Sequence, residues 1–264
     1  MPTTTVDGVS LHYEADGEGE TVVFVGEAGL GAWQWAWQYD ELVGPYETVV
    51  WDLRGTGNSD TPPGPYSVDQ LATDLEAVLA ASDARRAHVV GAGLGGMVAL
   101  GYARAFDRAK TLTLFGTAPR GEVYDTDELA ALYAGEAVQA ADEASIRDSL
   151  TVGFSADFLA RERIVQQLCE WRLAEDADPT GFDAQVAAIE DFDAGPLYEL
   201  TVPTLVCHGL DDPVVDHEIG KQLAENLPRG TFEPVEGRHL CHLEHARAVS
   251  NRLDGFLAEY CQPK

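Results

Sequence analysis

The sequence predicts an α/β fold in which a mainly parallel sheet is covered by helices on both faces. Two observations carry this prediction. Before residue 120 and after residue 195, short apolar runs alternate with segments whose apolar residues recur at helical spacing. The intervening residues, 120–195, contain several helical patterns but no buried-strand run. We therefore expect one core formed by residues 1–119 and 196–264, with a helical cap subdomain inserted at 120–195.

The elements before the predicted cap follow from local patterns. The opening segment TTTVDGVSLHYEADG predicts a hairpin that turns at Asp7-Gly8. The continuous apolar run at 21–26 is typical of a strand buried on both faces. Ser67 and Gln70 can form a capping box at the start of a helix. The elements that follow residue 26 are expected to be a helix at 32–43, a strand at 46–52, a helix at 66–82, a strand at 87–91, a helix at 94–106 and a strand at 110–116.

Strand and helix alternate again after the predicted cap. Strands are expected at 202–209 and 230–237, with helices at 218–227 and 243–260. Together with the hairpin and the earlier strands, these make an eight-stranded sheet.

Composition and charge restrict the possible functions. The chain has 264 residues and is 45% hydrophobic, as expected of a globular protein. Forty-five acids and 17 bases give a formal net charge of −28, which disfavours binding to nucleic acid or to anionic membranes. Only three bases are lysine, and this acid-rich, lysine-poor composition resembles that of cytosolic proteins from salt-in halophiles. We therefore expect a small-molecule ligand, no nucleic acid partner and no membrane partner.

The lack of a recognisable targeting segment and the pattern of the cysteines favour a cytoplasmic protein. No apolar run reaches the roughly 20 residues that span a bilayer, and the first ten residues do not resemble a signal peptide. The four cysteines have no metal-ligand spacing, so free thiols are expected, although disulfides remain possible. No metal and no cofactor are expected.

A glycine-rich turn at 88–100, HVVGAGLGGMVAL, allows two interpretations. Gly91, Gly93 and Gly96 have the G-x-G-x-x-G spacing of a dinucleotide-binding turn. They also fit the nucleophile elbow G-x-S-x-G-G, with Gly93 in place of the serine. A dinucleotide fold requires an acid about 20 residues further on, at the end of the next strand. KTLTLFGTAPR carries none there, so the elbow is favoured.

Four further segments support the interpretation as an elbow. Together with the elbow, they make the chain resemble the α/β-hydrolase superfamily. They correspond to the segments that follow the third, fourth, seventh and eighth strands of that fold: FVGEAGLGAWQW (24–35), WDLRGTGNSD (51–60), LVCHGLDDPVV (205–215) and VEGRHLCHLEH (235–245). The resemblance implies an α/β-hydrolase fold with a cap, and an active site whose parts follow the order nucleophile, acid, histidine.

The same resemblance implies which residues form the catalytic pair. Asp212 matches the acid and His239 matches the histidine, which the acid would orient. The neighbouring Asp211 is an alternative acid, and His242 and His245 are alternative histidines.

The catalytic machinery departs from the family pattern twice. Gly93 leaves the nucleophile position without a side chain. Gly26-Glu27 replaces the usual His-Gly of the oxyanion loop. The backbone N–H groups of Ala28 and Leu94 are still expected to point into the pocket. A carboxylate from Glu27 near them would oppose an oxyanion.

Several residues close to these motifs have two interpretations. Trp33 and Trp35 either pack in the core or place at least one indole in the ligand pocket. Cys241 is expected to be an inert buried thiol. Thr117 follows the sixth strand and is an alternative nucleophile, although no elbow holds it.

Two functions fit these residues. In the first, the protein is a cofactor-independent enzyme without a serine nucleophile. His239, oriented by Asp212 and assisted by Glu27 as acid or second base, would act on a small apolar substrate by direct hydrolysis, elimination or isomerisation. In the alternative, the protein is a ligand-binding pseudo-hydrolase without catalysis.

Overall fold

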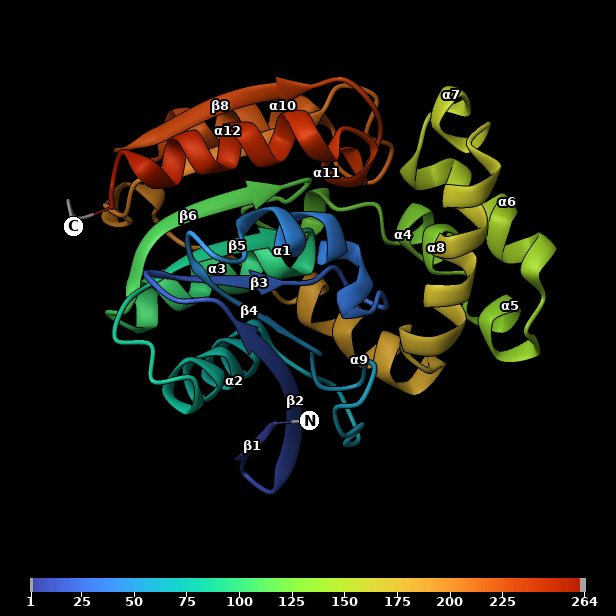
Figure 1. Ribbon diagram of the computed structural model, residues 1–264, viewed down its shortest axis with the longest axis horizontal. Coiled ribbons are helices and arrows are strands. Elements are labelled where there is room, and N and C mark those ends of the chain that lie inside the picture. Colours follow the sequence, from blue (N-terminus) through green and yellow to red (C-terminus); the bar gives the residue numbers. More distant parts are fainter. Residues whose placement is uncertain (1, 262–264) are drawn as a thin grey trace.

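The computed structural model describes residues 2–261, and its centre is an eight-stranded sheet (Figure 1). The strand order is β1-β2-β4-β3-β5-β6-β7-β8. The pairs β1–β2 and β2–β4 are antiparallel, and all other neighbouring strands are parallel. The strands are β1 (Thr3–Val6), β2 (Val9–Asp16), β3 (Thr21–Val25), β4 (Glu47–Trp51), β5 (Ala87–Ala92), β6 (Ala109–Phe115), β7 (Thr204–Gly209) and β8 (Gly230–Val235). The predicted eight-stranded, mainly parallel sheet is confirmed.

Helices cover both faces of this sheet. Strand side chains alternate between the two faces, so each face presents apolar residues to the helices that cover it. Val22 and Phe24 of β3 pack in one core cluster, whereas Val23 and Val25 pack in the other. The first cluster also holds side chains of α1 (Ala36–Leu42) and α12 (Ala246–Ala258). The second holds side chains of α2 (Val68–Ala81), α3 (Leu94–Ala105) and α10 (His217–Asn226). Among the described residues, no helix has both the length and the apolar character to cross a bilayer.

Local signals account for several boundaries. Asp7 and Gly8 both have positive φ, at 49° and 85°, as the two central residues of a type I′ hairpin turn require. Ser67 caps α2, because its hydroxyl accepts the backbone N–H of Gln70 at 3.2 Å. The helix expected at 32–43 begins as a 3-10 turn, η1 (Ala32–Trp35), before continuing as α1.

Residues 120–195 contribute helices and no strand to the sheet. These helices gather beside the carboxyl ends of the central strands (Figure 1). They are η2 (Gly121–Val123), α4 (Thr126–Tyr133), α5 (Gly135–Ala140), α6 (Glu143–Gly153), α7 (Ala156–Leu159), α8 (Glu162–Glu175) and α9 (Pro179–Glu190). The chain returns to β7 through η3 (Leu197–Glu199), and α11 (Cys241–Glu244) precedes α12.

The helices of 120–195 hold the loop that follows β3. The side-chain oxygen of Gln185 accepts the backbone N–H of Gly29 at 2.7 Å. Asp176 accepts the indole N–H of Trp33 at 2.7 Å. Both acceptors are buried. The loop that carries Glu27 is therefore fixed between the sheet and the 120–195 helices.

Candidate active site

The turn at Gly93 joins β5 to α3, and two observations distinguish its glycine from a residue with a side chain. Its φ of 51° and ψ of −115° lie where side chains are rarely accommodated. In addition, a β-carbon built on Gly93 would overlap the carboxylate of Glu27, and the nearest atom, Oε2, would lie within covalent-bond distance. A serine at this position would therefore require the Glu27 carboxylate to move from the place it occupies.

Glu27 reaches this point because β3 and β5 are neighbouring parallel strands. Their carboxyl ends lie at the same edge of the sheet, so the loop after β3 lies beside the turn after β5. Glu27 is fully buried. Its Oε1 accepts the backbone N–H of Ala28 at 2.6 Å and that of Leu94 at 2.9 Å. These are the two N–H groups expected to bind an oxyanion, so the Glu27 carboxylate occupies that place itself.

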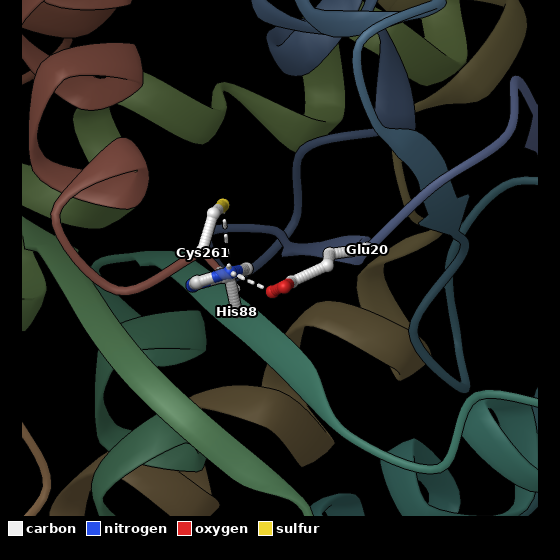
Figure 2. A group of neighbouring side chains, drawn as sticks. All are labelled: Glu20, His88 and Cys261. Atoms are coloured by element: carbon white, nitrogen blue, oxygen red, sulfur yellow. Dashed lines mark hydrogen bonds and ion pairs between the residues drawn. The ribbon is translucent and has the colours of Figure 1, made fainter. Parts of the chain in front are cut away.

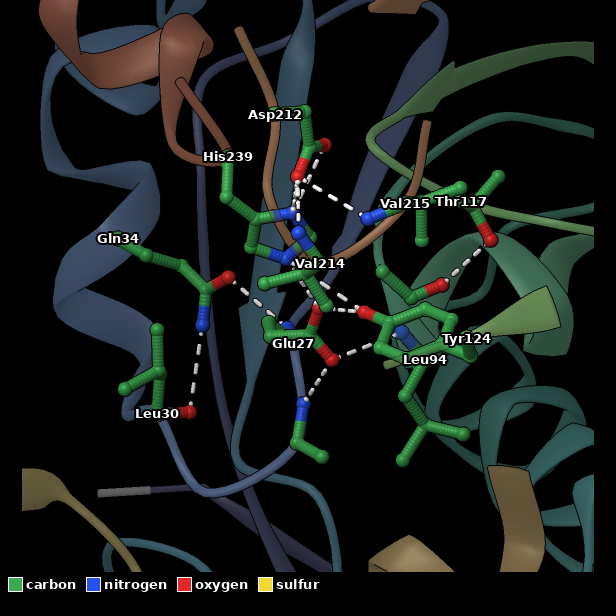
Figure 3. A network of polar contacts seen from close by, with 12 residues as sticks. Glu27, Leu30, Gln34, Leu94, Thr117, Tyr124, Asp212, Val214, Val215 and His239 are labelled. Atoms are coloured by element: carbon green, nitrogen blue, oxygen red, sulfur yellow. Dashed lines mark hydrogen bonds and ion pairs between the residues drawn. The ribbon is translucent and has the colours of Figure 1, made fainter. Parts of the chain in front are cut away.

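The second carboxylate oxygen faces the histidine (Figure 3). Glu27 Oε2 lies 2.8 Å from His239 Nε2 and also accepts the hydroxyl of Tyr124. A serine side chain at position 93 would place its hydroxyl in this region, because Oε2 lies within covalent-bond distance of the absent β-carbon. Oε2 thus stands where a nucleophilic oxygen would stand.

The structure brings the side chains of His239 and Asp212 together. His239 Nδ1 lies 2.9 Å from Asp212 Oδ2 and 3.0 Å from Oδ1. The backbone N–H groups of Val214 and Val215 donate to Asp212 Oδ1, and His208 Nε2 lies 3.1 Å from Oδ2. Asp211, the alternative acid, is exposed to solvent and therefore does not lie in this buried site.

Two carboxylates around one imidazole keep that imidazole protonated. Burial alone would lower the pKa of His239, but the charges and hydrogen bonds of Asp212 and Glu27 outweigh burial and raise it to about 10. Burial likewise opposes ionisation of Asp212, yet the charge of His239 and the hydrogen bond from His208 hold the pKa of Asp212 below its usual range. At neutral pH the site therefore holds an imidazolium that donates from Nδ1 to Asp212 and from Nε2 to Glu27.

Tyr124 is a site residue that the sequence did not indicate. It follows η2 at the start of 120–195 and lies within no motif. The backbone N–H of Asp125 donates to the carbonyl of Val214 at 2.8 Å, which ties this segment to the loop of Asp212. Burial and the charge of Glu27 raise the pKa of Tyr124 well above its usual value, so the phenol stays protonated and donates.

Within the described residues, Trp33 and Trp35 form no hydrogen bond or ring contact with Glu27, Asp212 or His239. Trp35 packs against Phe24 and against His242, with ring centroids 5.1 and 4.7 Å apart. Trp33 donates to Asp176. Their positions agree with core packing and with anchoring of 120–195.

The alternative nucleophiles are engaged or inert. The hydroxyl of Thr117 donates to the carbonyl of Gly93 at 2.6 Å and is fully buried. Burial raises the pKa of the Cys241 thiol well above its usual value, which suppresses the reactive thiolate. Of the alternative histidines, His242 is buried in the core beside Trp35, and His245 lies at the N-terminus of α12.

Among residues 2–261, one group of side chains has metal-ligating chemistry, and it lies at the opposite end of β5 (Figure 2). Glu20 Oε2 lies 3.2 Å from His88 Nε2, and Cys261 Sγ lies 4.0 Å from the same nitrogen. Zinc accepts these three ligand types. However, the ammonium of Lys110 already forms an ion pair with Glu20. The three residues are too far apart in the sequence for a spacing motif to indicate them.

The candidate site is closed to solvent. Glu27 is 0% exposed, His239 3% and Tyr124 6%. Tyr124, which comes from 120–195, donates its hydroxyl to Glu27 Oε2 in this buried site.

Comparisons with known proteins agree with this architecture. A model of the alpha/beta hydrolase family matches residues 22–252. The 3-oxoadipate enol-lactonase 2 of Acinetobacter baylyi is 27% identical over 263 residues, which cover 98% of this chain and 97% of that protein. The crystal structure of the enol-lactonase from Burkholderia xenovorans has a TM-score of 0.85 at 27% identity, covering 97% of this chain and 100% of that one. The structure of a hydrolase from Pseudomonas aeruginosa has a TM-score of 0.83 at 28% identity, covering 96% of each chain. The chain therefore belongs to the alpha/beta hydrolase family.

Proposed function

We propose that the protein is a cofactor-independent enzyme that lacks a serine nucleophile and acts on a small molecule through His239, Asp212 and Glu27. The observation that carries this proposal is the 2.8 Å contact between Glu27 Oε2 and His239 Nε2, with Asp212 on the other imidazole nitrogen. This contact puts a proton donor and an acceptor side by side in a buried site.

The charge state of the site supports acid–base chemistry. The imidazolium of His239 can give a proton to a substrate atom, and the Glu27 carboxylate can receive one. Since both groups are buried, their charges are weakly screened and act strongly on whatever enters. Direct hydrolysis, elimination and isomerisation are the reaction classes that such a pair can serve.

We propose further that residues 120–195 act as a cap. Tyr124 comes from this segment and donates to Glu27 Oε2, so a substrate must displace its hydroxyl. Val214, Val215 and Leu94 border the carboxylate and the imidazole (Figure 3). Such a border suits a small, largely apolar substrate with one polar group.

The names of the relatives suggest substrates with a carbonyl group, but the position of Glu27 argues against assigning such substrates to this chain. An enol-lactonase opens an ester, and a charged oxygen forms during such a reaction. In this chain the N–H groups of Ala28 and Leu94 already bind Glu27 Oε1. A substrate carbonyl would have to displace that oxygen, so we do not carry the lactone specificity over.

The test compares the turnover of variants at opposite ends of the central strands. His239→Gln and Glu27→Gln are each expected to reduce turnover by at least about a hundredfold, the usual contribution of a general acid or base. His88→Gln is the matched control, because His88 also contacts a glutamate but lies at the other end of β5. Assays of hydrolysis, elimination and isomerisation on small esters, epoxides and enones measure the effect. Full activity in both active-site variants would refute the proposal.

A second candidate function is ligand binding without catalysis. The observation that favours it is the occupied oxyanion site, in which Glu27 satisfies both backbone donors. In that case a ligand that co-purifies with the protein would be recovered unchanged. No turnover would then appear between pH 5 and pH 10 in any assay.

We also propose that the acidic composition adapts the protein to a high-salt cytoplasm. Forty-five acids against 17 bases make the folded state repel itself at low salt. All four cysteines are free thiols, as a reducing compartment favours. Thermal unfolding in KCl tests this, since Tm should rise steeply between about 0.1 and 2 M as the charges are screened. A flat profile would contradict the adaptation.

A further inference from the structure

We propose that Glu20, His88 and Cys261 form a zinc-binding site at the amino ends of β3 and β5. The site lies at the opposite end of these strands from Glu27 and shares no residue with the proposed catalytic centre. The proposal is therefore independent of the proposed function, and its test needs no enzyme assay. Bound zinc would fasten the segment after α12 to the sheet.

Three separate parts of the chain bring these side chains to one place (Figure 2). Glu20 directly precedes β3, and His88 is the second residue of β5. Since β3 and β5 are neighbouring parallel strands in which Val22 pairs with His88, their amino ends lie at the same edge of the sheet. Cys261 follows α12 and packs against the same core cluster as Val22. A carboxylate, an imidazole and a thiol thus meet at that edge.

The separations of the three ligand atoms suit zinc. Glu20 Oε2 lies 3.2 Å from His88 Nε2, and Cys261 Sγ lies 4.0 Å from the same nitrogen. All three atoms lie within 4.8 Å of one another. Tetrahedral zinc bonds of about 2.0–2.3 Å place ligand atoms roughly 3.3–3.6 Å apart. The oxygen and the nitrogen are already close to this spacing, and the sulfur has to move toward them.

His88 is held in an orientation that suits a metal ligand. The residue is fully buried, so its ring cannot turn into solvent. Its Nδ1 lies 2.7 Å from the hydroxyl oxygen of Thr111. This hydroxyl can accept a hydrogen bond from Nδ1–H, which leaves the lone pair of Nε2 facing Glu20 and Cys261. Metal-binding histidines usually have such an outer partner, because it fixes the tautomer and the ring orientation.

The mixture of ligand types favours zinc over hard cations. Mg²⁺ and Ca²⁺ bind through oxygen, whereas this group has one carboxylate, one imidazole and one thiol. Zinc takes all three ligand types, and three protein ligands leave a fourth position for water. A thiolate and a carboxylate together neutralise the charge of Zn²⁺. The bound centre therefore adds no net charge beside the buried His88, which keeps the cost of burial low.

Lys110 of β6 competes with zinc for this place. Its ammonium forms an ion pair with Glu20. The lysine side chain is 15% exposed and that of Glu20 is 31% exposed, so a metal ion can enter from solvent while the flexible lysine turns outward. Zinc carries two charges and also bonds to nitrogen and sulfur. Removing the ammonium should therefore strengthen zinc binding.

Cobalt and zinc titrations test the proposal. The probe is Co²⁺, added to the reduced full chain after treatment with EDTA, and Zn²⁺ then competes for the site. We expect one cobalt ion per chain, a sulfur-to-cobalt charge-transfer band in the near ultraviolet, and visible bands as intense as those of four-coordinate cobalt. Zinc should abolish these bands and raise Tm, because it binds the folded chain.

Two variants change the site in opposite directions. Cys261→Ser should remove the charge-transfer band and weaken zinc binding by at least about a hundredfold, the upper end of what the loss of an outer partner costs. Cys261 is only partly buried, so this variant should fold. Lys110→Met should strengthen zinc binding by about two- to fivefold, as expected from the loss of a partly exposed ion pair.

Matched controls separate this site from binding by surface carboxylates. Glu18→Gln changes an exposed acid two residues before Glu20, and Cys169→Ala removes a thiol of α8, so both should keep wild-type affinity. Cobalt binding without the sulfur band, or with unchanged affinity in Cys261→Ser, would overturn the proposal. Absence of one-to-one zinc binding in both wild type and Lys110→Met would overturn it as well.

Discussion

A glutamate–histidine contact lies near each end of the neighbouring parallel strands β3 and β5. At the carboxyl ends, Glu27 Oε2 lies 2.8 Å from His239 Nε2. At the amino ends, Glu20 Oε2 lies 3.2 Å from His88 Nε2 (Figure 2). Both histidines are buried. The two contacts therefore join the same atom types, a carboxylate Oε2 and an imidazole Nε2, at similar distances.

The charges around the two pairs differ, and so do the histidines. His239 has Asp212 on its other nitrogen, and its pKa is raised to about 10. His88 instead has the hydroxyl of Thr111 on Nδ1, while the ammonium of Lys110 pairs with Glu20. Burial lowers the pKa of His88, and Lys110 adds to this effect. Burial lowers the pKa of both histidines, so their opposite shifts follow from the different charges around them and not from the similar contact distances.

The largest expected effect comes from converting the carboxyl end to a serine site. In Glu27→Gly with Gly93→Ser, the overlap disappears, and the new serine faces His239 with both backbone donors free. We expect p-nitrophenyl acetate hydrolysis at least about a hundredfold faster than in Gly93→Ser alone, a part of what a full triad supplies. Initial rates and labelling by a serine-directed phosphonate measure it. Equal activity in the single variant would show that serine and Glu27 coexist.

The next effect compares stability at the two ends. His239→Gln leaves Glu27 and Asp212 buried without their shared cation, and breaking such a pair costs about 3–5 kcal/mol. His88→Gln removes only a neutral hydrogen-bonding ring, with an expected cost of about 1 kcal/mol. Urea unfolding of both variants at the same KCl concentration checks the difference. Comparable losses would mean that His239 is not an imidazolium.

A smaller effect is the opposite pH dependence of the two histidines. His239 has a folded-state pKa of about 10 against an ordinary 6.5, so its contribution is complete below pH 6.5 and is lost as pH rises toward 10. The lowered pKa of His88 makes the unfolded state bind the extra proton, so its contribution is lost as pH falls below 6.5. Subtracting each glutamine variant from wild type in unfolding titrations isolates the two slopes. Slopes of equal sign would contradict the comparison.

The smallest effect should come from Lys110→Met. This change removes the cation beside Glu20, so the pKa of His88 should rise. The ion pair is partly exposed, and the expected loss of stability is at most about 1 kcal/mol. NMR titration of His88 in the variant and in wild type measures the shift. An unchanged pKa would show that burial alone keeps His88 neutral.

The fold was predictable because each element has a local signal. The apolar run of β3, the Asp7-Gly8 turn and the Ser67 cap all depend on residues adjacent in sequence. The motif positions of Asp212 and His239 also point to two side chains that lie 2.9 Å apart in the structure.

The site itself was only partly predictable. The sequence presented Gly93 and Glu27 as two separate departures, whereas the structure makes them one exchange within one space. That relation depends on β3 and β5 being neighbours, which lies beyond any local pattern. Tyr124 was missed for the same reason, because the folding of 120–195 over the sheet brings it to Glu27.

The adjacency of β3 and β5 has a consequence for how such sites evolve. The loop after β3 and the turn after β5 meet at this point, and either can supply an oxygen. The turn after β5 can do so with the short side chain of a serine, and the loop after β3 with the longer side chain of a glutamate. A lineage can therefore move an oxygen from one loop to its neighbour by substitutions confined to these two loops, with every strand left in place. Descendants of such an exchange would lack the residue that defines the ancestral motif while retaining an oxygen at the same point in space.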